Sequence, residues 1–135
     1  MRRCKAADLP AVLELWRTSG AAPSVTDNIV ALHRRLKQNP QLFLLALDGS
    51  RIVGSVLGGW DGWRASMARL TVAPAYRRRG VALELVRRIE TLLRRLGAKR
   101  ISCIVLKENV NARAFWLSAR YRLDSDAVRF VKDLR

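Results

Sequence analysis

Side chains that commonly ligate metals or act as nucleophiles are scarce in this sequence of 135 residues. It has two cysteines, Cys4 and Cys103, and one histidine, His33. Their spacing matches no zinc motif, and a lone histidine does not favour a Ser-His-Asp mechanism. We therefore expect no metal. We also expect neither thiol to be a nucleophile, with Cys103 inside a core strand and Cys4 partly exposed.

Long apolar runs are also missing. A membrane-spanning helix needs ~18 apolar residues in succession, and no stretch of this sequence approaches that length. The first eight residues, Met1 to Asp8, lack the apolar core of a signal peptide. These absences predict a cytoplasmic protein without a membrane partner.

Acidic residues are few, with 11 Asp and Glu against 26 Lys and Arg, which gives a net charge of +15. The excess is concentrated after residue 67, where 17 basic side chains accompany 6 acidic ones. Such a surface attracts anions, and nucleic acid, an acidic protein and a polyphosphate cofactor all qualify. The apolar fraction of 50% is nevertheless ordinary for a folded protein, so residues 1–135 are predicted to form a single domain.

Hydrophobic periodicity predicts two helices before any long strand. Asp8 caps a helix that ends before Gly20, and Thr26 or Asp27 caps a second helix. Turn signals and changes of period then place the remaining elements. In chain order these are strands at 42–47, 52–57 and 65–72, a helix ending at Gly97, a strand at 101–106, a helix at 111–120, and terminal strands at 121–123 and 128–131, with a short strand at 2–5 in front.

This order predicts an α/β (α+β) fold in which a mixed, mostly antiparallel central sheet carries helices on both faces. The strand, helix and strand between residues 65 and 106 are expected to form a parallel crossover unit. A ligand is expected at the first turn of that unit.

That turn has the features of an anion site. Three consecutive arginines, Arg77 to Arg79, precede Gly80 and the small Ala82. Unpaired backbone N–H groups at a helix N-terminus attract anions, and small residues let a phosphate approach the main chain. Cations are unfavourable at a helix N-terminus, so the arginines indicate a bound polyanion rather than a solvated charge run.

Here the sequence resembles the GCN5-related N-acetyltransferase (GNAT) family. Residues Arg77 to Ala82 match its acyl-coenzyme A signature, Gln/Arg-x-x-Gly-x-Gly/Ala, and Asn109 to Trp116 are similar to its Asn-x-x-Ala-x-x-Leu/Phe-Tyr segment. Ala7 to Trp16 resemble the family's first helix, and Gly58 to Trp63 resemble the bacterial YpeA-like subgroup. The resemblance covers almost the whole chain and implies a GNAT-like acyl-CoA acyltransferase fold.

The resemblance implies an enzyme that moves the acetyl group of acetyl-CoA to a primary amine of a small molecule or protein, by direct attack in a ternary complex. The third meander strand and the 101–106 strand would splay apart, so that the backbone of Leu70 and Val72 binds the pantetheine arm. A main-chain N–H near Val72 would polarise the thioester carbonyl. The expected cofactor contacts are Leu70, Thr71, Val72, Arg77, Arg78, Arg79, Gly80, Val81, Ala82, Asn109, Ala112 and Trp116.

The catalytic groups stay unassigned. Where the family carries a tyrosine, proposed as the general acid, this sequence has Trp116, whose indole is a poor proton donor. Tyr121 and Glu108 are candidates, although core packing is the favoured interpretation of Tyr121 and a solvated loop that of Glu108. The alternative function is a non-catalytic acyl-CoA-binding or nucleic-acid-binding regulatory protein on the same fold, with nucleic acid the less favoured partner. A monomer or a homodimer is expected.

Overall fold

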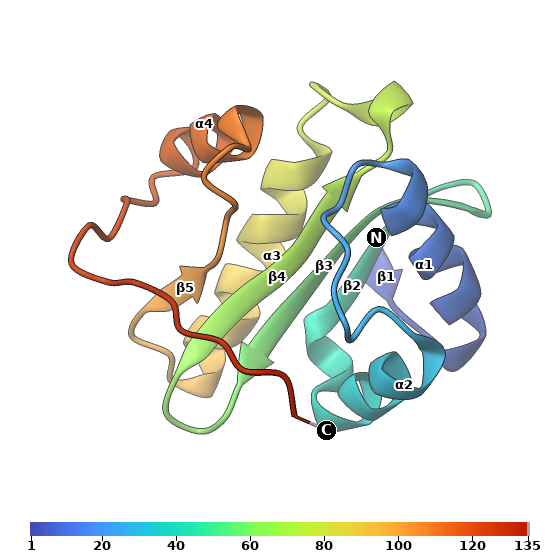
Figure 1. Cartoon of the computed structure of the whole chain (residues 1–135). Helices are drawn as coiled ribbons and strands as arrows, with labels where there is room; N and C mark the ends of the chain where they lie inside the picture. Colours follow the sequence, from blue (N-terminus) through green and yellow to red (C-terminus); the bar gives the residue numbers. More distant parts are fainter. Residues whose placement is uncertain (135) are drawn as a thin grey trace. The chain divides into compact units, whose positions relative to one another are not determined.

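The structure, a computed structural model, describes residues 1–134 (Figure 1). The chain forms two compact units, Met1–Ile104 and the residues from Val105 onward, and each is described by itself. Among residues 1–134, no helix is both long enough and apolar enough to cross a bilayer.

The first unit is built around a five-stranded sheet in the order β1-β2-β3-β4-β5. The first three pairings are antiparallel and β4 pairs with β5 in parallel, which confirms the predicted mixed, mostly antiparallel sheet. The strand predicted at 65–72 has the bounds of β4, whereas β5 ends three residues before the predicted limit. The strands are β1 (Arg2–Arg3), β2 (Phe43–Asp48), β3 (Arg51–Trp60), β4 (Ala65–Val72) and β5 (Ile101–Cys103).

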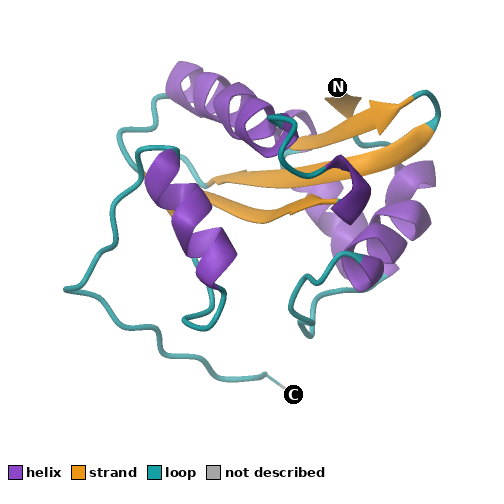
Figure 2. Cartoon of the chain, turned by 90° about the horizontal axis from the view of Figure 1, so that it is seen from above, coloured by secondary structure: helices purple, strands orange, loops and turns teal. Residues whose placement is uncertain are grey.

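Helices cover both faces of this sheet (Figure 2). On one face the helix α3 lies so close to β3 that a Cβ at Gly58 would stand 3.0 Å from Ile89. On the other face Trp16 of α1 bonds Ser55 of β3, and Arg35 of α2 donates to the carbonyl of Gly58. The helices of this unit are α1 (Leu9–Thr18), α2 (Ile29–Gln38) and α3 (Val81–Leu96), with short 3-10 turns at Ala6–Asp8, Pro40–Leu42 and Pro74–Tyr76.

The N-terminus of α2 differs from the sequence prediction. Asn28 is the N-cap, and its Oδ1 accepts the N–H of Ala31 at 2.9 Å. The prediction that Thr26 or Asp27 caps this helix is wrong. The carboxylate of Asp27 instead accepts the N–H of Ser24 and pairs with Arg69. A short loop before α2 is thereby tied to the sheet.

Glycines in the left-handed conformation bound α3. Gly80 is the N-cap with φ +79°, and as a glycine it has no side chain to cap the helix N-terminus. Gly97 has φ +105° and donates its N–H to the carbonyl of Arg94 at 3.1 Å, which confirms the predicted end of the helix.

The second unit contains α4 (Val110–Ser118), which confirms the helix predicted at 111–120. Asn109 caps it, because its Oδ1 accepts the N–H of Ala112 at 3.0 Å. Residues 121–134 contain no strand, so the predicted strands at 121–123 and 128–131 are wrong. Val128 and Phe130 are 82% and 92% exposed. A pattern typical of strands forms one only beside a pairing partner, and no such pairing occurs in this described segment.

Candidate functional site

One edge of β4 is open where the strand approaches the predicted ligand turn. β5 pairs only with the first three residues of β4, and no described strand pairs with the remainder on that side. Pairing between the two strands is therefore limited to the beginning of β4, and the splay stays a prediction. The N–H of Ala73 bonds the carbonyl of Val53 at 2.8 Å, so the N–H of the preceding Val72 points away from β3 to the open edge. An extended ligand can pair there as an added strand.

β4 is irregular at the start of this open edge. Its register against β3 shifts between Ser55 and Leu57, so that Val56 stands opposite two residues, Arg69 and Leu70. Arg69 has φ +53°, a left-handed conformation that costs a non-glycine residue ~1–3 kcal/mol. Such β-bulges redirect side chains and are frequent next to active sites.

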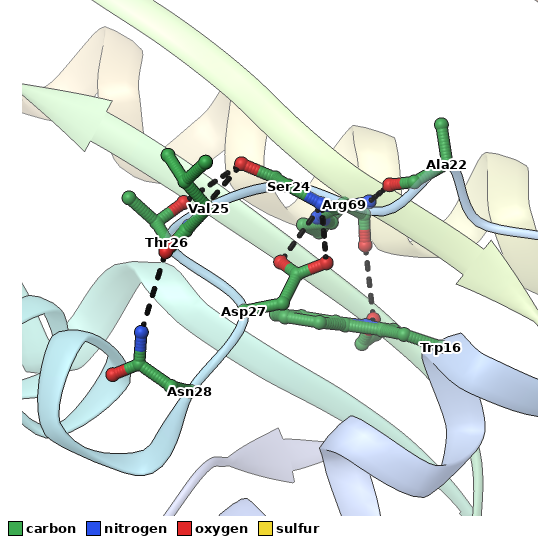
Figure 3. Close-up of polar contacts among 9 residues, drawn as sticks. Trp16, Ala22, Ser24, Val25, Thr26, Asp27, Asn28 and Arg69 are labelled. Carbon is green, nitrogen blue, oxygen red and sulfur yellow. Dashed lines mark hydrogen bonds and ion pairs between the residues drawn. The ribbon is translucent and has the colours of Figure 1, made fainter. Parts of the chain in front are cut away.

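Arg69 is held at both its backbone and its side chain (Figure 3). Trp16 Nε1 donates to Ser55 Oγ at 2.8 Å, and Ser55 Oγ donates to the carbonyl of Arg69 at 2.9 Å. The guanidinium donates to both carboxylate oxygens of Asp27 at 2.8 Å and to the carbonyl of Ala22 at 2.7 Å. It also lies 5.1 Å from the centroid of the Trp16 ring. We call these five residues the Arg69 cluster.

The Arg69 cluster is largely shielded from water. The side chains of Arg69 and Asp27 are 18% and 22% exposed, and Ser55 is fully buried. A two-point, charge-assisted contact at this depth holds its partners more firmly than a surface ion pair does. The sequence does not predict this cluster, because its members come from three segments that are distant in the chain. The one available signal was an arginine within a strand of otherwise small and apolar residues.

The turn between β4 and α3 has the backbone of an anion site. Positive φ angles of +62° at Arg78 and +79° at Gly80 follow a φ of −70° at Arg77. The first amides of α3 lack helical acceptors, and the N-cap residue, Gly80, has no side chain with which to cap them. A Cβ at Gly80 would meet nothing within 4 Å, so the space beside it is free for a ligand.

The three arginines of this turn have different surroundings, although the sequence treats them alike. Arg77 donates from Nε to the carbonyl of Val72 at 3.0 Å and from Nη2 to the carbonyl of Ser19 at 2.6 Å, so it braces the turn against the end of α1. Arg79 lies 5.4 Å from the ring centroid of Tyr76. Arg78 and Arg79 are exposed at the mouth of the turn.

Tyr76 is part of the same turn. Its hydroxyl donates to Asp48 Oδ2 at 2.6 Å, which joins the turn to the end of β2. This hydrogen bond, together with partial desolvation, raises the pKa of the phenol. The turn is thus fixed to two other elements, by Arg77 to α1 and by Tyr76 to β2.

The predicted site residues of the second unit lie on or beside α4. Asn109 and Ala112 form the N-cap pair, and Trp116 stands one helical turn further along. The ring of Tyr121 packs edge-on against Trp116, with centroids 4.7 Å apart, which agrees with the packing interpretation of Tyr121. Glu108 is exposed in the turn before the helix.

Both cysteines are free and poorly reactive. Burial raises the pKa of the Cys4 thiol to about 12 and that of Cys103 to about 11. Cys4 is only 5% exposed, so the expected partial exposure is wrong: its N–H pairs with the carbonyl of Phe43 and draws the residue under the sheet edge. Within residues 1–134, no three metal-ligating side chains gather in one place.

Known proteins are similar to this chain in sequence and in fold. Residues 9–119 match the model of the Acetyltransferase (GNAT) family. An acetyltransferase of Pectobacterium atrosepticum is 38% identical over 102 residues, which are 76% of this chain and 72% of that protein.

Two solved structures illustrate the likeness in fold. Ard1 of Thermoplasma volcanium has a TM-score of 0.82 at 18% identity, over 92% of this chain and 82% of that one. The PaiA N-acetyltransferase of Thermoplasma acidophilum, solved in complex with coenzyme A, has a TM-score of 0.77 at 18% identity, over 87% and 85% of the two chains. At these identities the structures establish the fold, and the sequence matches establish the family. The chain belongs to the GNAT family of acetyltransferases.

Proposed function

We propose that this protein moves the acetyl group of acetyl-CoA to a primary amine of a small molecule or protein, by direct attack in a ternary complex. The observation that carries the proposal is the junction of β4 and α3, where an open strand edge leads into an uncapped helix N-terminus. Membership of the GNAT family supports acetyl-CoA as the co-substrate. The PaiA protein of similar fold was solved with coenzyme A.

The turn before α3 fits the diphosphate of coenzyme A. Gly80, the N-cap of α3, has no side chain to cap the helix, and the space beside it is free. Arg78 and Arg79 are exposed there and offset the negative charge of the diphosphate. Arg77 acts through the turn, because its guanidinium is bonded to two backbone carbonyls of the protein.

The open edge of β4 fits the pantetheine arm. Acetyl-CoA supplies a thioester, and residues Leu70 to Val72 offer backbone groups along which its arm can extend. The N–H of Val72, which points to that edge, stabilises the negative charge that develops on the thioester oxygen as the amine attacks. A C–N bond forms while the C–S bond breaks, the thiolate leaves with the electron pair, and the amine proton passes to water. Proximity supplies much of the acceleration.

The remaining expectations stay part of the proposal. The family model spans parts of both units, which supports a single functional domain over residues 1–135 and a cofactor role for Asn109, Ala112 and Trp116. Assignment to the YpeA-like subgroup depends on the Gly58 to Trp63 segment alone. We also expect the protein to act in the cytoplasm as a monomer or homodimer. No residue is assigned as general acid or base.

Cofactor binding is tested by thermal unfolding with and without millimolar acetyl-CoA. The parent is expected to gain stability from the ligand, because binding to the native state raises the melting temperature. Gly80→Val should abolish that gain by filling the space beside the amides. Gly62→Val is the matched control, since Gly62 also has positive φ, +90°, and open space around its Cβ position. Both variants strain a turn, but only the first removes the response to acetyl-CoA.

Turnover is tested by release of free coenzyme A thiol from acetyl-CoA in the presence of diamines, amino sugars, amino acids and peptides with free α-amino groups. Amine-dependent release supports the enzyme. A melting shift without release from any amine would instead favour the non-catalytic acyl-CoA-binding alternative. Absence of both in the parent protein would overturn the proposal.

A further inference from the structure

Arg69 occupies a backbone conformation that arginine does not favour. Glycine, asparagine or aspartate adopts a φ of +53° at lower cost. Arginine at this position therefore has to contribute through its side chain. That side chain makes three hydrogen bonds and a cation–π contact, all with the first 27 residues of the chain.

These contacts connect two segments that would otherwise move separately. Ala22 and Asp27 both belong to the loop between α1 and α2, which Arg69 thereby fastens to β4. The carbonyl of Arg69 is fixed at the same time by Ser55, which in turn accepts from Trp16 of α1. The bulge is consequently held from both its main chain and its side chain.

The position of the bulge matters because Leu70 to Val72 follow it directly along the open edge of β4. Loosening Arg69 would shift these backbone groups, including the N–H of Val72. The turn at Arg78 to Ala82 is braced through Arg77 to Ser19 and through Tyr76 to Asp48. One hydrogen bond, from Arg77 Nε to the carbonyl of Val72, joins the two halves of the site, and their other supporting contacts are different.

We propose that Arg69 is a positioning residue for acetyl transfer: with Asp27 and Trp16 it holds Leu70 to Val72 where the thioester must lie. This inference rests on the proposed function. It requires that loss of the guanidinium lowers kcat much more than it weakens binding of acetyl-CoA, because the diphosphate is bound at the separate turn. A displacement of about 1 Å at reacting atoms is enough to slow a reaction roughly a hundredfold.

The test compares Arg69→Asn with the parent, using the most active amine from the thiol-release screen. Asparagine tolerates the left-handed conformation, so the backbone of the bulge is retained while the guanidinium is lost. We expect kcat to fall roughly ten- to hundredfold and the KM for acetyl-CoA to stay within about twofold. Arg69→Lys should recover part of kcat, because its ammonium can still pair with Asp27.

A matched control comes from α1. Arg17 also pairs with both oxygens of a carboxylate, donating from Nε and Nη2 to Glu14, but their side chains are 71% and 59% exposed. Arg17→Asn should leave kcat unchanged. Asp27→Asn in the parent should lower kcat, and the same substitution in Arg69→Asn should add little, because both changes break one contact. Hydrogen exchange at residues 20–28 should accelerate in Arg69→Asn and not in Arg17→Asn.

The outcomes separate the inference from the function on which it rests. A parent that releases thiol with an amine, together with an Arg69→Asn variant of unchanged kcat, would overturn the inference alone. Equal losses of kcat and of acetyl-CoA binding would also overturn it, since Arg69 would then serve only general stability. A parent with no melting shift and no thiol release would overturn the proposed function and the inference together.

Discussion

Trp16 meets Arg69 at two separate points. Its ring lies 5.1 Å from the guanidinium, and its Nε1 reaches the Arg69 carbonyl through the hydroxyl of Ser55. One residue of α1 thus supports both the side chain and the main chain of a single residue in β4. Ser55 is the link in this arrangement, and it is completely buried.

Replacing Ser55 should therefore destabilise the fold more than a conservative change of Trp16. Ser55→Ala leaves the indole N–H and the Arg69 carbonyl without partners in a buried place, at about 2–4 kcal/mol for the two groups. Trp16→Phe removes one donor and keeps Ser55 bonded to Arg69, so about 1–2 kcal/mol is expected. Urea unfolding followed by circular dichroism measures both. An Ser55→Ala variant as stable as Trp16→Phe would contradict this account of the hydrogen-bond chain.

A pH dependence of stability is expected from the N-terminus. Asp8 accepts two hydrogen bonds from Arg2, at 2.6 and 3.0 Å, and one from the N–H of Lys5 at 2.8 Å. These contacts, the Arg2 hydrogen bonds first, lower the pKa of Asp8 below its ordinary 3.8. A lowered folded-state pKa stabilises the protein above the unfolded value, and this contribution is lost as the pH falls through the folded value.

Asp8→Asn tests this dependence. The variant should be less stable than the parent at about pH 6, and the difference should shrink at about pH 3, which lies below the ordinary pKa of 3.8 that applies to the unfolded chain. The parent's remaining acid sensitivity has another source in Asp61, whose pKa is lowered by the N–H groups of Arg64 and Trp63. Urea unfolding of both proteins at the two pH values decides the matter. A difference that grows toward acid pH would show that the sign is wrong.

Local patterns predict the elements of this protein well where one segment contains its own determinants. The 65–72 strand and the glycine at the end of α3 could be read from alternation and from a single residue type. The start of α3 was also predictable, because a glycine and exposed arginines are adjacent in the chain before the helix. Such features need no knowledge of the rest of the fold.

The features that the sequence did not predict depend on contacts between residues that are distant in the chain. Asp27 and Arg69 are 42 residues apart. The sequence around Asp27 predicts a helix cap, which needs no distant partner. The sequence does not predict the bulge in β4, because the residue with positive φ is Arg69 and not a glycine. The terminal segment has strand-forming residues such as Val128 and Phe130, yet strands require pairing that composition does not guarantee.

The two cysteine thiols of the protein should react only slowly with the reagents that detect free coenzyme A, and so contribute little to that signal. Burial raises the pKa of Cys103 to about 11 and that of Cys4 to about 12, against an ordinary 9.0. At about pH 8 the thiolate fraction of Cys103 is then about a hundredfold below that of an ordinary thiol, and that of Cys4 lower still. Alkylation by iodoacetamide, followed by mass spectrometry, should modify Cys103 before Cys4, and both only slowly. Rapid modification of Cys4 in the folded protein would contradict its burial.

Trp116→Tyr tests whether the leaving thiolate needs a proton donor. The substitution places a phenol where the family resemblance expects one, beside the ring of Tyr121, whose centroid lies 4.7 Å away in the parent. A thiolate is a good leaving group with a thiol pKa near 8.5, so departure without an acid is not limiting. We therefore expect kcat with the best amine of the screen to change less than about tenfold, because general acid catalysis would be worth 10²–10⁴-fold where it is needed. Trp116→Phe controls for the loss of the indole. A rise in kcat of about a hundredfold in Trp116→Tyr alone would show that proton transfer to sulfur limits the parent enzyme.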